Sequence, residues 1–151
     1  MWEDAGSLHD RPRLDLTAIE ERICRLEASP GADAVPELVA LAEQVLEHWI
    51  VARGEVPTDQ TREGFRLLAL HRQGARGDPS FNACRETCRE LAYHHNLVQL
   101  EPEHPETGKR SRLAAMLAKH LCLFVAGKMQ EAGLGEFCCS SRPLRSTETV
   151  E

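Results

Sequence analysis

The stretch over residues 109–132 reads KRSRLAAMLAKHLCLFVAGKMQEA and gives the strongest evidence for the fold class. Its length suits a helix of about six turns. Apolar side chains fall on nearly every side of that helix: Leu113, Met116, Leu117, Leu121, Leu123, Phe124, Val125 and Met129. A helix that is apolar all round lies at the centre of a packed structure or in an interface between subunits. Gly133, followed by Leu134, is typical of a left-handed helix end.

Four further helices are predicted before this one, each from apolar residues at helical spacing between a start signal and a stop signal. Their approximate ranges are 17–28, 34–53, 58–73 and 80–100. Thr17 and Glu20 fit a capping box at the first start, and Asp78-Pro79 is a strong signal before the fourth helix. No segment alternates with period two for long enough to predict a strand. The sequence therefore predicts an all-α, single-domain bundle of about five helices around a central apolar C-terminal helix.

The length of 151 residues matches one domain. We expect residues 1–13 to be a flexible N-terminal arm, residues 14–137 to be the helical bundle, and residues 138–151 to be a flexible tail. The acidic N-terminus lacks the apolar stretch of a secretory signal, and no apolar run reaches ~18 residues. These features favour a cytoplasmic protein that does not enter a membrane.

The net charge of −6 argues against general nucleic-acid binding, because phosphate affinity needs concentrated lysine and arginine. One segment departs from this acidic character. Residues 62–89 hold six arginines and three acidic residues, a net charge of +3. This segment predicts either a solvated helix face or a surface for an acidic partner.

The chain also has six cysteines and seven histidines. Cys84 and Cys88 lie one turn apart on the helix predicted over 80–100, and His95 falls on the same side two turns later. Two thiolates supply half of the ligands that zinc commonly takes. His120, on the C-terminal helix, is the first choice for a further ligand, and His95 is the next. The metal hypothesis therefore names Cys84, Cys88, His120 and His95, with zinc, iron or haem as the group bound.

Two other interpretations of the thiols stay open. Cys84 and Cys88 continue a stripe with Phe81, Leu91 and Val98, and cysteine is a small apolar residue that is often buried. The same pair is alternatively a redox dithiol.

The remaining cysteines and histidines carry weaker expectations. Cys24 is interpreted as core filler, and Cys138-Cys139 as an accessible pair near the end of the chain. His71 is expected to be exposed. His120 is expected to pack inward, with Cys122 pointing away from it.

No sequence motif indicates catalysis: there is no glycine-rich phosphate loop, no G-x-S-x-G and no H-E-x-x-H. We therefore expect a small binding or accessory protein that acts through protein–protein association, either with a protein partner or as a homo-oligomer through the C-terminal helix. The alternative is a metal- or haem-binding sensor or carrier with its site between the last two helices. A third possibility is a regulator whose residues 62–89 meet an acidic partner.

Overall fold

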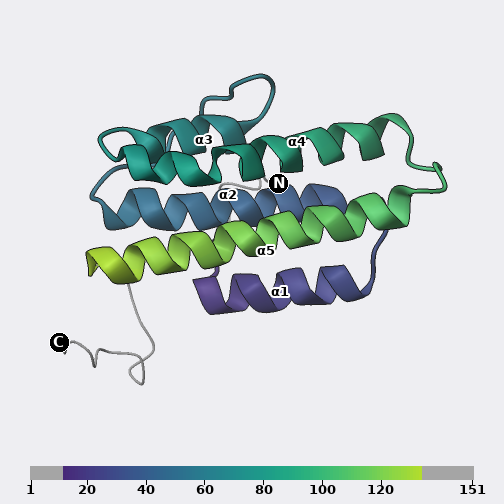
Figure 1. Ribbon diagram of the computed structural model, residues 1–151, viewed down its shortest axis with the longest axis horizontal. Helices are drawn as coiled ribbons and strands as arrows, with labels where there is room; N and C mark the ends of the chain where they lie inside the picture. The colour runs from purple at the N-terminus through teal and green to yellow at the C-terminus, as the bar shows by residue number, and fades with distance from the viewer. Residues whose placement is uncertain (1–11, 134–151) are drawn as a thin grey trace, which may run out of the picture.

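The computed structural model describes residues 12–133, which form an all-α bundle (Figure 1). The elements are α1 (Leu16–Ala28), α2 (Ala34–Ala52), α3 (Arg66–Ala75), the 3-10 helix η3 (Pro79–Cys84), α4 (Arg85–Leu100) and α5 (Thr107–Ala132). Within 12–133 the only β-type pairing is an isolated bridge between Arg62 and Phe65. The predicted fold class is confirmed. The expected arm and tail lie outside the described residues, except for residues 12 and 13.

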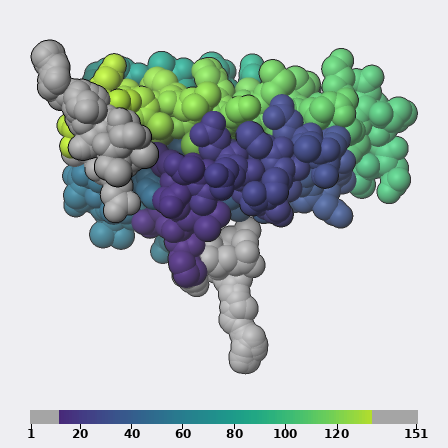
Figure 2. Space-filling model, turned by 90° about the horizontal axis from the view of Figure 1, so that it is seen from below, coloured from purple at the N-terminus to yellow at the C-terminus, as the bar shows by residue number. Residues whose placement is uncertain are grey.

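Helices α2 and α5 together form the middle of the bundle, with α1 on one side of them and α3 and α4 on the other (Figure 1). Helix α5 packs against α1, α2 and α4, and α2 packs against α1, α3, α4 and α5. Figure 2 shows α1 and α5 side by side on the face that α3 does not reach. The C-terminal helix is therefore central, as predicted, but it shares that place with α2. None of the described helices has the length and apolar character needed to cross a membrane.

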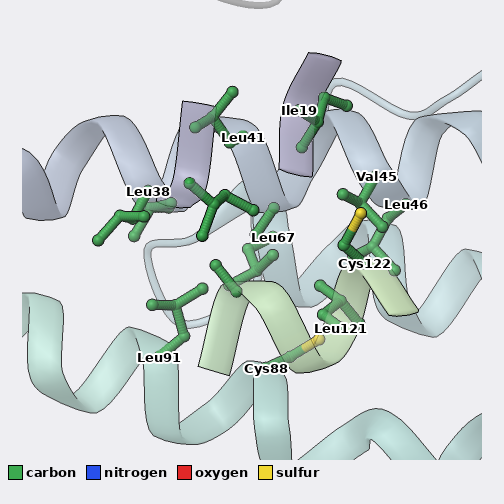
Figure 3. Packing of buried hydrophobic residues seen from close by; sticks show 14 of the residues in the cluster. Ile19, Leu38, Leu41, Val45, Leu46, Leu67, Cys88, Leu91, Leu121 and Cys122 are labelled. Atoms are coloured by element: carbon green, nitrogen blue, oxygen red, sulfur yellow. The ribbon is translucent and has the colours of Figure 1, made fainter. Parts of the chain in front are cut away.

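The core side of α5 is narrower than its sequence suggested. The helix buries a stripe that includes Ala114, Ala118, Cys122 and Val125. Figure 3 shows the sulfur atoms of Cys122 and Cys88 inside the apolar cluster. The opposite side of α5 leaves Met116 55% exposed and Leu123 53% exposed.

Helix ends follow local chemistry. The Asp15 side chain accepts a hydrogen bond from the Ala18 backbone N at 2.7 Å, so Asp15 caps α1 and the predicted capping box at Thr17 is wrong. Gly133 has φ 68°, which confirms the left-handed end predicted for α5.

The third helix starts about eight residues later than the sequence predicted, at Arg66. Side chains hold the preceding loop in a non-helical path. Gln73 accepts from the Thr58 backbone N at 2.9 Å and donates to the Val56 carbonyl at 2.9 Å. Arg66 Nε donates to the Thr58 carbonyl at 2.8 Å. These bonds satisfy backbone groups that a helix would otherwise have satisfied.

The predicted fourth helix is divided in two. Pro79 follows the N-cap Asp78, as the start signal indicated, but the first six residues form η3. Helix α4 begins only at Arg85, and Cys84 is its N-cap. This division places Cys84 at the junction of two helices, with Cys88 one turn into α4.

Candidate functional site

A hollow of about 470 Å³ lies between α3 and the segment formed by η3 and the start of α4. We call it the arginine hollow. Its lining residues are Arg62, Leu68, His71, Arg72, Ala75, Arg76, Asn82, Arg85 and Arg89. Five of these nine side chains carry a guanidinium group, so the hollow is strongly cationic in a chain whose net charge is −6.

The sequence spacing explains why the arginines converge. Arg72 lies in the last turn of α3 and Arg76 is the extended C-cap residue directly after that helix, whereas Arg85 and Arg89 are one turn apart on α4. Because α3 packs against both η3 and α4, the two pairs line a common space. Arg62 joins them from the loop between α2 and α3.

Within the described part of the chain, most of this positive charge has no counter-ion. Arg89 pairs with Glu63 at 3.1 Å, which raises the pKa of Arg89. The guanidinium groups of the other four arginines in the hollow form no ion pair or side-chain hydrogen bond with any residue in 12–133. Unpaired like charges around one hollow repel each other, and an anion that enters relieves that repulsion.

The positive surface continues beyond the arginine hollow. A second hollow, of about 580 Å³, lies against residues 56–61. Arg62, Arg72 and Arg76 line both spaces. These three side chains form a ridge between two adjoining hollows, so the surface suits an extended ligand better than a single small ion.

His71 lines the arginine hollow but is only 5% exposed, so the expectation of an exposed His71 was wrong. The cause is Phe81 of η3. The His71 ring stacks on the Phe81 ring with centroids 5.5 Å apart, and Phe81 stacks on Trp49 at 5.1 Å. His71 Nε2 lies 3.2 Å from the Phe81 carbonyl oxygen.

The structure brings Cys84 and Cys88 together, and both are buried. The Cys84 Sγ lies against His71 and 3.3 Å from the Phe81 carbonyl oxygen. Hydrogen bonds from Cys88 and His71 lower the pKa of Cys84 to about 6. The pKa of Cys88 moves the other way, well above its usual value, because of the hydrogen bond to Cys84 and burial.

The other two candidate metal ligands lie apart from this pair. His95 is half-buried, with its ring edge-on to Phe65 at 5.2 Å. His120 is exposed on α5, so the expectation of an inward His120 was wrong. Among residues 12–133, no group of three or more His, Cys, Asp or Glu side chains is placed to hold a metal ion. A metal site that combines Cys84 and Cys88 with both histidines stays a prediction, because the described residues do not bring these side chains together as one set of ligands.

Two further expectations concern cysteines. Cys24, interpreted as core filler, is exposed on α1, so that interpretation was wrong. Cys122 points away from His120, as expected, but it is the buried residue of the two, and burial raises its pKa to about 12. Cys138 and Cys139 lie outside the described residues.

The sequence indicated a positive segment but not a hollow. The usable signal was the i, i+4 spacing of arginines, at Arg85 and Arg89 on α4 and at Arg72 and Arg76 at the end of α3. His71 and Asn82 gave no such signal, because they join the site only through the packing of α3 on η3.

Comparisons with protein-family models, curated proteins and solved structures give no match to this chain. The function is therefore inferred from the residues of the hollow and from the thiol pair beneath it.

Proposed function

We propose that this protein is a binding or accessory protein that holds an acidic segment of a partner protein in the arginine hollow. The observation that carries the proposal is the set of four guanidinium groups with no ion-pair partner in 12–133, arranged around two adjoining hollows. Guanidinium groups bind carboxylates through two parallel hydrogen bonds, and this geometry favours arginine over lysine for recognising acidic side chains.

Charge balance favours a local acidic segment over a nucleic acid as the ligand. Residues 62–89 have a net charge of +3, whereas the whole chain has −6, so the residues outside this segment carry the negative excess. Affinity for a long polyphosphate needs many lysines and arginines, and the rest of this chain is net acidic. A short peptide places its carboxylates in the two hollows and leaves the acidic surface uncovered.

A cytoplasmic location and a second mode of association belong to the same proposal. The four cysteines in the described range are free thiols, a state that persists in a reducing compartment. Met116 and Leu123 give α5 an exposed apolar side, which supports self-association through that helix. The acidic partner and the second copy would thus use different faces.

The test is fluorescence anisotropy with a labelled peptide of glutamate and alanine, compared with its glutamine counterpart. We expect the glutamate peptide to bind, and we expect Arg72→Glu/Arg76→Glu to weaken binding at least ~10-fold, since two charge-assisted contacts are lost. Arg112→Glu is the matched control, because Arg112 is exposed on α5, far from the hollow in sequence.

Three results would contradict the proposal. The first is no preference for glutamate over glutamine. The second is an equal loss of binding in Arg112→Glu, which would indicate a general charge effect. The third is tighter binding of a single-stranded oligonucleotide than of the glutamate peptide at the same salt concentration, which would identify a nucleic-acid site instead.

A further inference from the structure

A dithiol lies beneath the arginine hollow. Cys84 ends η3 and caps α4, and Cys88 follows one turn later. The two residues are 2% and 1% exposed. His71 connects them to the hollow, because it lines that space and its Nε2 lies 3.2 Å from the Phe81 carbonyl oxygen, from which the Cys84 Sγ is 3.3 Å away.

The two sulfurs differ in protonation at neutral pH. The pKa of Cys84, lowered to about 6 by hydrogen bonds from Cys88 and His71, makes it a thiolate, whereas the raised pKa of Cys88 keeps it protonated. The groups that act on Cys84 are His71 from α3 and Cys88 from α4. Lys128, which reaches η3 from α5, is engaged by Asp78 at 3.2 Å. A thiolate beside a protonated thiol is the arrangement of an attacking and a resolving cysteine.

The spacing also suits a disulfide. Cα atoms one helical turn apart are about 6 Å from each other, within the range of about 4.4–6.8 Å that disulfides span. Cys84 has φ −100° and ψ 11°, outside α-helical geometry. A link to Cys88 therefore requires adjustment at the junction of η3 and α4 rather than inside a regular helix.

Cys122 shows that burial alone does not lower the pKa of a thiol in this protein. It is 1% exposed, and its thiol lies 3.8 Å from the Leu16 carbonyl oxygen. Burial raises its pKa to about 12, with the charge of Glu20 adding to the effect. The chain thus holds a buried thiolate at Cys84 and a buried neutral thiol at Cys122, which makes Cys122 an internal control.

We propose that Cys84 and Cys88 are a redox site that forms a reversible intramolecular disulfide, with hydrogen peroxide as the oxidant. The Cys84 thiolate attacks one peroxide oxygen, the O–O bond breaks, and the leaving hydroxide takes a proton from solvent. Cys84 is then a sulfenic acid. The Cys88 sulfur attacks the Cys84 sulfur, the S–O bond breaks, and the Cys88 proton leaves with the hydroxyl group as a second water. The two cysteines lose two electrons and peroxide gains them; exchange with a small thiol reverses the reaction.

The disulfide has a consequence for the hollow, and this consequence rests on the proposed function. Arg85 and Arg89 directly follow Cys84 and Cys88 in the chain, and both line the hollow. Drawing the sulfurs together also moves the Cys84 sulfur away from the Phe81 carbonyl oxygen. Oxidation should therefore move both guanidinium groups and change the affinity for an acidic peptide.

The experiment uses the full chain with Cys24, Cys138 and Cys139 replaced by serine, so that three thiols remain. Hydrogen peroxide is added at neutral pH, and the protein is denatured, alkylated and analysed by mass spectrometry. We expect a loss of about 2 Da and a single alkylated thiol. Peptide mapping should find the crosslink at Cys84–Cys88 and the alkyl group on Cys122. In Cys88→Ser, dimedone should trap the sulfenic acid at Cys84.

The pH profile separates this site from an ordinary thiol. Oxidation should reach half its maximal rate near pH 6, the pKa of Cys84. His71→Gln should move that midpoint upward, whereas His120→Gln, on an exposed residue, should not. Circular dichroism confirms that each variant is folded. The redox proposal is overturned by a midpoint near pH 9, by oxidation of Cys122 as fast as Cys84, or by the absence of the crosslink.

Peptide binding to the reduced and oxidised protein distinguishes the two proposals. A changed affinity after oxidation supports the coupling to the hollow. Unchanged affinity of a protein with a mapped crosslink overturns the coupling alone. Failure of the reduced protein to bind the glutamate peptide overturns the proposed function, while the mass of the oxidised protein still decides the redox site.

Discussion

Replacing Glu47 by alanine should lower the free energy of unfolding by about 3 kcal/mol. Glu47 lies on α2 and is only 5% exposed. Its carboxylate accepts from Arg13 Nε at 2.8 Å and from Arg66 Nη1 at 2.5 Å. Arg66 is itself largely buried and also holds the loop before α3 through the Thr58 carbonyl. Removing Glu47 leaves the Arg66 guanidinium without its closest counter-ion.

The magnitude follows from the surroundings of that pair. Removing one partner of a buried ion pair costs about 3–5 kcal/mol, because the other charge stays buried. The lower end applies here, since Glu43 lies 3.6 Å from Arg66 Nη1 and compensates part of the lost charge. With a urea dependence of about 2 kcal/mol/M, the midpoint of unfolding should fall by about 1.5 M. The melting temperature should fall by about 10 °C.

Urea denaturation followed by circular dichroism measures this change, and Arg22→Ala is the control. Arg22 pairs with Glu37 at 2.5 Å, but both side chains are about 40% exposed, so its loss should destabilise the protein far less than the loss of Glu47. If Glu47→Ala costs no more than Arg22→Ala, the buried pair adds no more stability than an exposed one, contrary to this prediction.

Three further predictions concern the thiol, the core and the surface. The pKa of Cys84 is about 6 in the folded chain and near 9 in the unfolded chain, so stability should rise between pH 6 and pH 9, where only the unfolded chain holds the proton. Urea titrations across that window should show a smaller rise in Cys84→Ser; an identical rise would contradict the assignment. Phe81→Ala, which removes the ring stacked on Trp49, should cost about 3–5 kcal/mol in thermal unfolding, and a loss below about 1 kcal/mol would argue against a core role. Light scattering should find a mass above 16.9 kDa that returns to 16.9 kDa in Met116→Glu/Leu123→Glu, whereas a monomer throughout rejects self-association through α5.

The fold class could be predicted because long periodic segments determine it. Helices α1, α2, α4 and α5 follow apolar spacing, and the Gly133 cap follows from glycine's tolerance of positive φ. The start of α3 could not be predicted, because long-range hydrogen bonds from Gln73 and Arg66 hold the loop before it. Local propensity carries no information about such bonds.

The site was predictable only where it lies within one helix. The proximity of Cys84 and Cys88 followed from their i, i+4 spacing. The burial of His71 did not, because it depends on Phe81 arriving from η3. The outward direction of His120 could not be predicted from the sequence, for a different reason. On a helix that is apolar on nearly every side, hydrophobicity alone does not identify the inner face, and the bundle packs on the side with small alanines.

The arginine hollow is tested most directly by NMR mapping of the unmodified chain during titration with the glutamate peptide. The largest amide shifts should fall in residues 68–76 and 82–89, and they should diminish as salt is added. Shifts concentrated on α1 or on the exposed side of α5, or shifts that persist unchanged at high salt, would contradict the account.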